Sequence, residues 1–310
     1  GLGNIGFLYD KLFKSKKSNL SHAKSIVGSK KFKLVCGVDK NLSKRKKFEN
    51  TFKLPSTSDL KKALSKYSPE IAIVATNNNS HYSIIKVLSD FKSIKNIVLE
   101  KPGGRNFNEL KNIYSLCQKK DISIIVNYTR LFQPYFKKIA KYLKNKELFA
   151  IFQYNRGIAN NCSHIISYLL SINFPNKISN ININVCGFKN NISIYIQWKN
   201  IKCLLINPGI KNLELTKLEI FTNKLKFTSD NNFAEFKVYE SQKSKLIKKH
   251  ILFEKFKLLK NVNKNNELKV FYKDLIQNFN EMDKYKKISL TTSKLIEKLK
   301  KYEKGYNKKF

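Results

Sequence analysis

The chain has 310 residues, of which 42% are hydrophobic, and it carries a formal net charge of +39. This length allows a sizeable core and about two domains, whereas no apolar run reaches the roughly 20 residues that span a bilayer. The five cysteines are scattered and form no C-x-x-C pair, which disfavours a disulfide framework or a metal site and favours a reducing cytoplasm. We therefore expect a cytoplasmic protein with neither a metal nor a membrane partner.

The positive charge raises the possibility of a polyanion or nucleic-acid binder. Lysines are spread over nearly every segment, and arginine, the residue best suited to phosphate and base recognition, occurs only at Arg45, Arg105, Arg130 and Arg156. We interpret the charge as a solvated lysine-rich surface and keep polyanion binding as an alternative. This alternative can be tested by measuring nucleic-acid affinity near physiological salt. Binding that is independent of sequence and micromolar or weaker would be explained by bulk electrostatics alone.

The first half of the chain alternates helix and strand patterns. After the opening GLGNIG (residues 1–6) and a short helix, apolar runs predict strands at residues 32–38, 70–76, 95–100 and 121–128. Helices are predicted at residues 58–67, 80–91 and 106–120, with Ser58 and Asn106 as candidate N-caps. This alternation indicates βαβ units and a doubly wound parallel sheet of the Rossmann type, with the ligand crevice at the carboxyl ends of the strands.

The pattern changes after about residue 145. Short strands are predicted at residues 148–155, 181–188, 192–198, 201–207, 218–222 and 224–229, and helices at 163–172, 270–282 and 291–306. Turn-like pairs between the strands indicate a mostly antiparallel sheet, hence a C-terminal α+β domain. An uncovered face of this sheet would be a natural interface for a homo-oligomer, a dimer or a tetramer.

We accordingly predict two domains. Residues 1–127 would be an NAD(P)-binding Rossmann domain whose first strand would precede Gly1. Residues 128–310 would be a domain for substrate binding and oligomerisation, with the C-terminal helix packing back on the Rossmann domain.

GLGNIG matches G-x-G-x-x-G, which predicts a dinucleotide-binding turn where it opens a helix. Gly1 would allow the tight bend, Gly3 would let the backbone approach a pyrophosphate, and Gly6 would let the helix pack closely. The first helical N–H groups, around Asn4 and Ile5, would face the phosphates. The alternative is a glycine loop that holds no cofactor.

Asp39 ends the apolar run at residues 32–38. The acidic partner of a dinucleotide turn usually follows by about 20 residues, whereas Asp39 lies 33 residues after Gly6. We interpret the polar stretch at residues 14–31 as an enlarged connection between the first helix and the second strand. A carboxylate at Asp39 would accept from a ribose 2′-OH and repel a 2′-phosphate, which favours NAD over NADP, although Lys40 weakens this preference.

At residues 98–106, VLEKPGGRN, the chain resembles the Gfo/Idh/MocA family of oxidoreductases. The family's Glu-Lys-Pro motif matches Glu100, Lys101 and Pro102, and its Ala-Thr-Pro-Asn-x-x-His stretch matches residues 75–81, with Asn77 in the proline position. Residues 156–170 resemble its G-x-H helix start, and residues 290–306 resemble its C-terminal helix. The resemblance covers nearly the whole chain and is closer to the branch linked to surface polysaccharides and nucleotide sugars.

The resemblance implies an NAD(P)-dependent dehydrogenase or reductase acting on a CH–OH group of a sugar or nucleotide sugar, in bacterial surface polysaccharide biosynthesis. Lys101 would lie beside the nicotinamide and polarise the reacting oxygen, and His164 would be a general base. Further cofactor-binding residues would be Thr76, Asn77, Asn78, His81 and Glu100. The alternatives are an ordinary surface lysine and a structural histidine.

Candidate substrate residues, besides Lys101 and His164, are Asn127, Tyr128, Arg130, Tyr154, Arg156 and Asn160. The arginines would anchor a phosphate or carboxylate or pair structurally with a carboxylate. Inositol-dehydrogenase-like members have aspartate at the position of Asn160, and many members have aspartate at that of Ser167. Asparagine cannot take a proton, so a catalytically lapsed dinucleotide-binding sensor or partner protein is a further alternative. We assign no role to His22 or His250.

Overall fold

The computed structural model describes residues 1–12, 19–155, 157–188, 191–210, 215–230, 233, 235–243, 251–263 and 267–306. The chain divides into two compact units, Gly1–Pro134 with Asn265–Lys294, and Tyr135–Lys264 with Leu295–Phe310. We name them the Rossmann unit and the second unit and describe each by itself. Among the described helices, none combines the length and the apolar character that crossing a bilayer requires.

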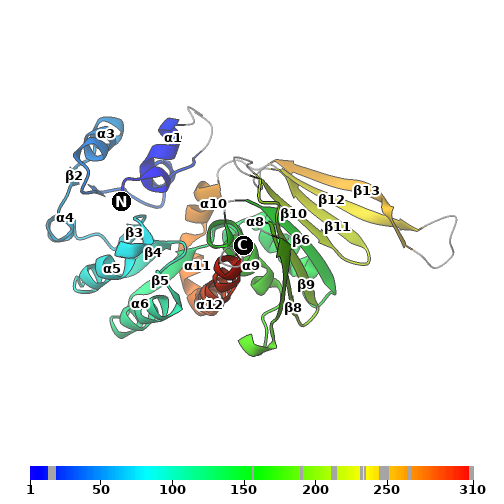
Figure 1. Ribbon diagram of the computed structural model, residues 1–310. Helices are drawn as coiled ribbons and strands as arrows, with labels where there is room; N and C mark the ends of the chain where they lie inside the picture. Colours follow the sequence, from blue (N-terminus) through cyan, green and yellow to red (C-terminus); the bar gives the residue numbers. More distant parts are fainter. Residues whose placement is uncertain are drawn as a thin grey trace. The chain divides into compact units, whose positions relative to one another are not determined.

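The described strands of the Rossmann unit all pair in parallel (Figure 1). One sheet has the order β3-β4-β5, built from Ile71–Val74, Asn96–Glu100 and Ser123–Asn127. A second, two-stranded sheet joins β1 (Gly37–Val38) to β2 (Ser56–Thr57). The parallel α/β class predicted for this part is confirmed, but the strand expected over residues 32–38 pairs only at its last two described residues.

Helices connect and follow these strands. Their bounds are η1 Asn4–Leu8, α1 Tyr9–Leu12, α2 His22–Val27, α3 Leu42–Phe52, α4 Leu60–Tyr67, η2 Asn78–Ser80, α5 His81–Ser89, α6 Phe107–Lys119 and α7 Thr129–Phe132. Later in the chain follow α10 Glu267–Lys273, α11 Leu275–Asn280 and α12 Met282–Tyr306, of which residues to Lys294 belong to this unit. In the sequence, the Rossmann unit therefore combines residues that precede the strands of the second unit with residues that follow them.

Two local predictions in this unit need correction. Helix α4 is capped by Asp59, whose side chain accepts from the Lys62 N–H, and not by Ser58. The stretch at residues 14–31 is not a plain connection, because its described part contains helix α2, with Ser21 as N-cap. The predicted cap of α6 is confirmed, since Asn106 Oδ1 accepts from the Glu109 N–H at 2.9 Å.

The second unit contains an eight-stranded sheet of order β13-β12-β11-β10-β6-β9-β8-β7. All neighbouring pairs are antiparallel except β6 with β9, which confirms the mostly antiparallel prediction. The bounds are β6 Leu148–Tyr154, β7 Asn182–Phe188, β8 Asn191–Trp198, β9 Ile201–Asn207, β10 Thr216–Phe221, β11 Leu225–Asp230, β12 Glu235–Lys243 and β13 Ile251–Asn263. The last two were not predicted.

Helices α8 (Pro134–Leu143) and α9 (Ser163–Ile172) lie on one face of this sheet (Figure 1). Residues alternate between buried and half-buried along β6, β9 and β10, so one sheet face carries the core. The rings of Phe136 contact those of Tyr168 and Phe236 at centroid distances of 4.6 and 4.9 Å. The short turns η3 (Ile158–Cys162) and η4 (Ile178–Asn180) flank α9.

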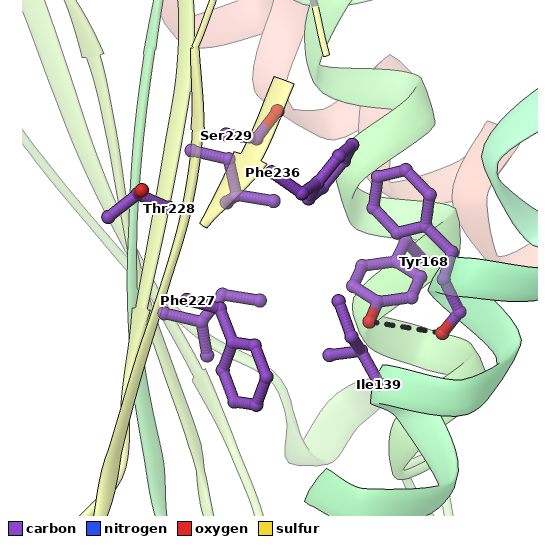
Figure 2. Close-up of a pocket in the computed structure, with 9 residues that line it drawn as sticks. Ile139, Tyr168, Phe227, Thr228, Ser229 and Phe236 are labelled. Atoms are coloured by element: carbon purple, nitrogen blue, oxygen red, sulfur yellow. Dashed lines mark hydrogen bonds between the residues drawn. The ribbon is translucent and has the colours of Figure 1, made fainter. Parts of the chain in front are cut away.

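A small cavity lies within this core, between the helices and strands β10 to β12 (Figure 2). Its lining is mostly aromatic and aliphatic, with Phe136, Ile139, Tyr168 and Phe227 among the lining residues. None of the predicted site residues borders it. We interpret the cavity as a packing space of the core rather than as a ligand site.

Candidate functional site

The glycine turn has the geometry that a dinucleotide needs. A Cβ on Gly1 would lie 2.7 Å from the Ala75 carbonyl oxygen, and a Cβ on Gly6 would lie 2.2 Å from the Gly1 carbonyl oxygen. A Cβ on Gly3 would meet no atom within 4 Å. Close packing thus requires glycine at Gly1 and Gly6, whereas the open space at Gly3 lets a ligand approach the backbone. This open approach suits a pyrophosphate.

Helix η1 starts directly after Gly3, whose carbonyl accepts from the N–H groups of Phe7 and Leu8 at 2.8 and 3.1 Å. Asn4 is exposed and Ile5 is half-buried at its first turn. Phe7 anchors the helix, with its ring 5.7 Å from that of Phe48 in an edge-on contact. The first N–H groups are therefore held at the mouth of the turn, where phosphates bind favourably.

Asp39 lies beside this turn. Its Oδ2 accepts from the Leu2 N–H at 2.8 Å and its Oδ1 from the Asn41 N–H at 2.9 Å. Burial works to raise the pKa of Asp39, but these two N–H groups and Lys44 outweigh it, so the pKa lies below its ordinary value. The carboxylate stays ionised and each oxygen retains acceptor capacity for a ribose hydroxyl.

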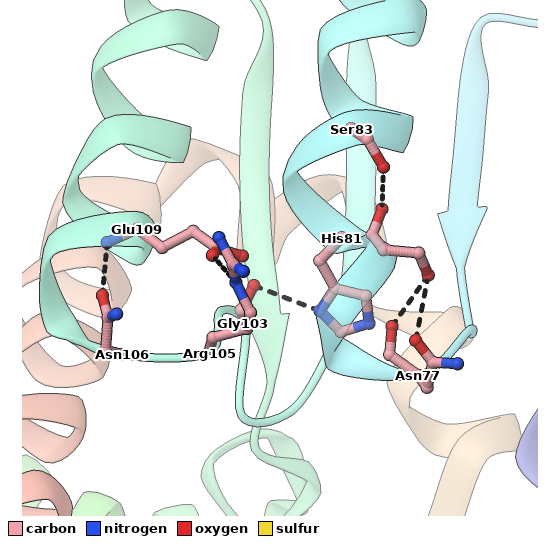
Figure 3. A network of polar contacts seen from close by, with 8 residues as sticks. Asn77, His81, Ser83, Gly103, Arg105, Asn106 and Glu109 are labelled. Atoms are coloured by element: carbon pink, nitrogen blue, oxygen red, sulfur yellow. Dashed lines mark hydrogen bonds and ion pairs between the residues drawn. The ribbon is translucent and has the colours of Figure 1, made fainter.

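His81 links the loops that follow β3 and β4 (Figure 3). It is fully buried, with Nδ1 3.1 Å from the Gly103 carbonyl oxygen and Nε2 3.2 Å from the Thr76 carbonyl oxygen. A neutral imidazole carries one N–H and can donate to only one of them. Burial is the largest influence and lowers the pKa of His81, although both carbonyls act to raise it.

The rest of these two loops is tied by short-range contacts. Ser80 Oγ lies 3.0 Å from Thr76 Oγ1 and donates to the Asn77 carbonyl at 2.9 Å. Asn77 is exposed and Asn78 is half-buried. After β4, Gly103 has a φ of +83° and packs against Leu110, so a side chain at this position would be strained. The predicted cofactor residues after β3 and β4 therefore sit on loops of defined shape.

Glu100, at the end of β4, is the centre of a buried polar chain. Its Oε1 accepts from Asn127 Nδ2 at 2.7 Å and from His22 Nε2 at 2.9 Å, and the Nδ1 of His22 lies 2.7 Å from the Tyr272 hydroxyl. Burial acts to raise the pKa of Glu100, but His22, Asn127 and Lys101 together lower it. The carboxylate is therefore held as an anion inside the unit.

Lys101 follows Glu100 directly and is joined to Pro102 by a cis peptide bond. Its side chain is half-buried. Burial lowers the pKa of Lys101 below its ordinary value, the negative charge of Glu100 raises it, and Arg130 lowers it further. An ammonium in this setting can donate a hydrogen bond and can also release a proton more readily than a surface lysine.

The other substrate candidates of the Rossmann unit differ in exposure. Asn127 is buried and committed to Glu100 through its amide nitrogen. Tyr128 is almost fully buried, and burial raises the pKa of its hydroxyl. Arg130 is half-buried, at the second position of α7, and close enough to affect Lys101. The contribution of these three residues to substrate binding remains a prediction.

The candidates of the second unit gather around η3 and the start of α9. His164 is half-buried at the second position of α9, and its carbonyl accepts from Ser167 Oγ at 2.9 Å. Asn160 is exposed on η3. Tyr154 is fully buried at the end of β6, stacked on Phe152 at 5.8 Å. Arg156 lies outside the described residues.

His22 and Tyr272 are the residues of this site that sequence reasoning missed. His22 was assigned to a polar connection, yet it begins the helix α2 and is almost fully buried. The signal available was Ser21 in an N-cap position followed by Ala23 and Ile26 on one helical face. Nothing local could have indicated that Tyr272, 250 residues later, would contact the same ring.

Comparisons with known proteins agree with this geometry. Residues 14–128 match the Gfo/Idh/MocA family model, described as an oxidoreductase family with an NAD-binding Rossmann fold. No curated protein sequence matches the chain.

Several solved structures share the fold. A dehydrogenase (MviM) from Clostridium difficile is 16% identical, with a TM-score of 0.65 and 97% of each chain covered. The 3-ketoreductase KijD10 from Actinomadura kijaniata, solved with NADP and TDP-benzene, is 10% identical, with a TM-score of 0.70 over 96% of this chain and 94% of that one. A dehydrogenase from Chromobacterium violaceum is 11% identical, with a TM-score of 0.70 over 96% and 92%.

Proposed function

We propose that this chain, whose residues 14–128 match the Gfo/Idh/MocA oxidoreductase family model, transfers a hydride between NAD(P) and a hydroxyl-bearing carbon of a sugar or nucleotide sugar. The observation that carries this proposal is the half-buried Lys101, which directly follows a buried carboxylate at the carboxyl end of β4. Ligands of doubly wound sheets bind at these strand ends. A role in surface polysaccharide biosynthesis is part of the proposal.

The residues of the Rossmann unit fit a dinucleotide. The backbone around Gly3 and the first N–H groups of η1 would receive the pyrophosphate, because the space at Gly3 is open. The Asp39 carboxylate, which lies beside this turn, would accept from a ribose hydroxyl. The loops after β3 and β4, held together by His81, would flank the nicotinamide. When bound, the nicotinamide supplies the hydride acceptor or donor.

Lys101 would donate a hydrogen bond to the reacting oxygen and stabilise the negative charge that develops there. The lowered pKa of Lys101 makes proton exchange with that oxygen easier near neutral pH. His164, near the start of α9, would exchange the substrate hydroxyl proton with solvent. Asn160 would orient a hydroxyl, since its amide can donate and accept but cannot take a proton.

Turnover of UDP- and TDP-linked sugars with NAD or NADP, followed by the absorbance of the reduced nicotinamide, tests the proposal. We expect Lys101→Ala to lower kcat by about 10²- to 10⁴-fold while the Kd for NADH changes less than about threefold. Lys111→Ala, on the exposed face of α6, is the matched control and should match the wild type. Turnover of Lys101→Ala at the wild-type rate would contradict the assignment, and NADH binding without turnover of any tested sugar by the wild type would favour the sensor alternative.

We also propose that a second copy of the chain covers the outward face of the second unit's sheet. Half-buried apolar side chains cluster in the middle of that face, and facing strands place Ile151 and Tyr195 on either side of Leu204. Phe149 lies opposite Phe221 at the end of this patch. An apolar patch on a sheet is a frequent site of self-association.

A further inference from the structure

We infer that His22 and Tyr272 are positioning residues for Lys101: they hold the buried Glu100 carboxylate as an anion next to the lysine, and so keep the lysine charged. The inference rests on the proposed function for its catalytic meaning. Neither residue belongs to the glycine turn, the loop after β3 or the Glu-Lys-Pro segment. Both come from helices, α2 and α10, that the sequence separates by more than two hundred residues.

The side chains form a continuous series of polar contacts from Tyr272 through His22 to Glu100. Tyr272 Oη and His22 Nδ1 are 2.7 Å apart, His22 Nε2 and Glu100 Oε1 are 2.9 Å apart, and Asn127 Nδ2 is 2.7 Å from the same oxygen. The His22 and Glu100 side chains are 3% and 11% exposed. The rings of His22 and Tyr272 also meet edge-on, with centroids 5.8 Å apart.

The donor and acceptor roles follow from the partners. An ionised Glu100 can only accept, so the Nε2 of His22 must carry a proton. The remaining ring nitrogen of a neutral His22 then accepts from the Tyr272 hydroxyl. Burial first, and the charge of Glu100 second, raise the pKa of Tyr272, so its proton stays available to donate. The hydroxyl thereby fixes the tautomer that the carboxylate needs.

Losing this support would change the electrostatics at Lys101. A buried carboxylate without a donor favours its neutral form, and a neutral Glu100 no longer stabilises the positive charge of Lys101, the next residue in the sequence. Glu100 is the group that raises the pKa of Lys101 against burial and against Arg130. Among the described residues, the titratable and charged groups around this centre include His22 from α2, His81 from α5, Lys101 after β4, Arg130 from α7 and Tyr272 from α10.

The acidity of Lys101 can be measured directly, without a substrate or cofactor, by competitive labelling of the full chain with acetic anhydride over a range of pH. Mass spectrometry of the peptide that contains Lys101 gives its reactivity. In His22→Leu we expect Lys101 to become roughly tenfold more reactive near pH 8, which corresponds to a pKa lower by about one unit. His22→Gln, which retains an N–H donor for Glu100, should stay within about twofold of the wild type.

Coupling through Glu100 is tested by a double-mutant cycle. Glu100→Gln alone should raise the reactivity of Lys101 as much as His22→Leu does. Adding His22→Leu to Glu100→Gln should not change that reactivity further. Tyr272→Phe should raise the reactivity of Lys101 by about threefold. It replaces His22→Leu as the test if circular dichroism shows that His22→Leu does not fold. Ser25→Ala, which removes a buried hydroxyl of the same helix with no hydrogen-bond partner among the described residues, is the control and should leave Lys101 unchanged.

A Lys101 titration that is the same in wild type, His22→Leu and Tyr272→Phe would overturn the inference. So would a further shift when His22→Leu is added to Glu100→Gln, because His22 would then act by another route. Because labelling needs no turnover, a wild-type protein that oxidised no sugar would count against the proposed function alone.

Discussion

At the scale of single residues, the three glycines of the opening turn have different tasks. Gly6 approaches the Gly1 carbonyl so closely that any Cβ would collide with backbone, whereas Gly3 has an ordinary φ of −72° and open space around it. We predict that Gly6→Ala lowers the free energy of unfolding by about 1–3 kcal/mol. Gly3→Ala should change it by less than about 0.5 kcal/mol and yet weaken NADH binding.

Urea unfolding and NADH fluorescence titration, applied to both variants, check this difference. The two glycines serve as controls for one another, because each substitution adds the same methyl group. Equal losses of stability in both variants would show that the turn is a packing feature without a phosphate cradle.

Asp39 is the residue on which the preference between NAD and NADP depends. Its carboxylate is ionised and fixed beside the glycine turn by Leu2 and Asn41. We predict that Asp39→Asn changes the ratio of NAD to NADP affinity by tenfold or more in favour of NADP, since the repulsion of a 2′-phosphate is removed. Asp59→Asn, at the exposed cap of α4, should leave the ratio unchanged. Paired Kd measurements decide, and an unaltered ratio in Asp39→Asn would count against the ribose assignment.

At the scale of elements, His81 links the loops after β3 and β4. His81→Leu removes the imidazole that lies between the Gly103 and Thr76 carbonyls, so the carbonyl that receives its single N–H loses that donor. We expect a loss of about 1–3 kcal/mol in the free energy of unfolding. Ser83→Ala, on the exposed side of the same helix, is the control and should stay within about 0.5 kcal/mol. An equally stable His81→Leu protein would contradict the role of His81 as a link.

The same histidine predicts a pH dependence. Its pKa in the folded chain lies below the ordinary value of 6.5, so the unfolded chain binds the additional proton first as the pH falls. The stability that neutral His81 contributes is therefore complete above about pH 6.5 and is lost as the pH falls toward the folded pKa. Between pH 7.5 and about pH 5, the free energy of unfolding should fall more steeply in the wild type than in His81→Leu. Parallel curves for the two proteins would contradict this pH dependence.

Elements with a strong local signal were predictable from sequence. Strands β3 to β5 are continuous apolar runs, and Asn106 followed by Glu109 marks the start of α6. Strands β12 and β13 were missed because lysines interrupt their apolar pattern, and β13 lies at the edge of the sheet. The position of Asp39 could be predicted from the end of an apolar run. The partnership of His22 with Glu100 could not, since it depends on packing between distant segments.

At the scale of the whole molecule, the face of the second unit's sheet opposite α8 and α9, on which no described helix packs, predicts self-association. We expect light scattering to give at least twice the mass of the 36.1 kDa chain. Leu204→Glu should shift it toward the monomer without changing the Kd for NADH, because a charge would be buried in the apolar patch. Leu42→Glu, which replaces a leucine of α3 that is already 55% exposed, is the control and should leave the mass unchanged. A monomeric wild type would contradict the proposed interface.

The central claim is that a nicotinamide binds at the strand ends beside Lys101. A crystal structure of the wild-type protein grown with NADH tests it most directly. We predict density for the pyrophosphate against Gly3 and the start of η1, and for the nicotinamide within contact distance of the Lys101 ammonium. Density for NADH elsewhere, or a nicotinamide turned away from Lys101, would contradict the account.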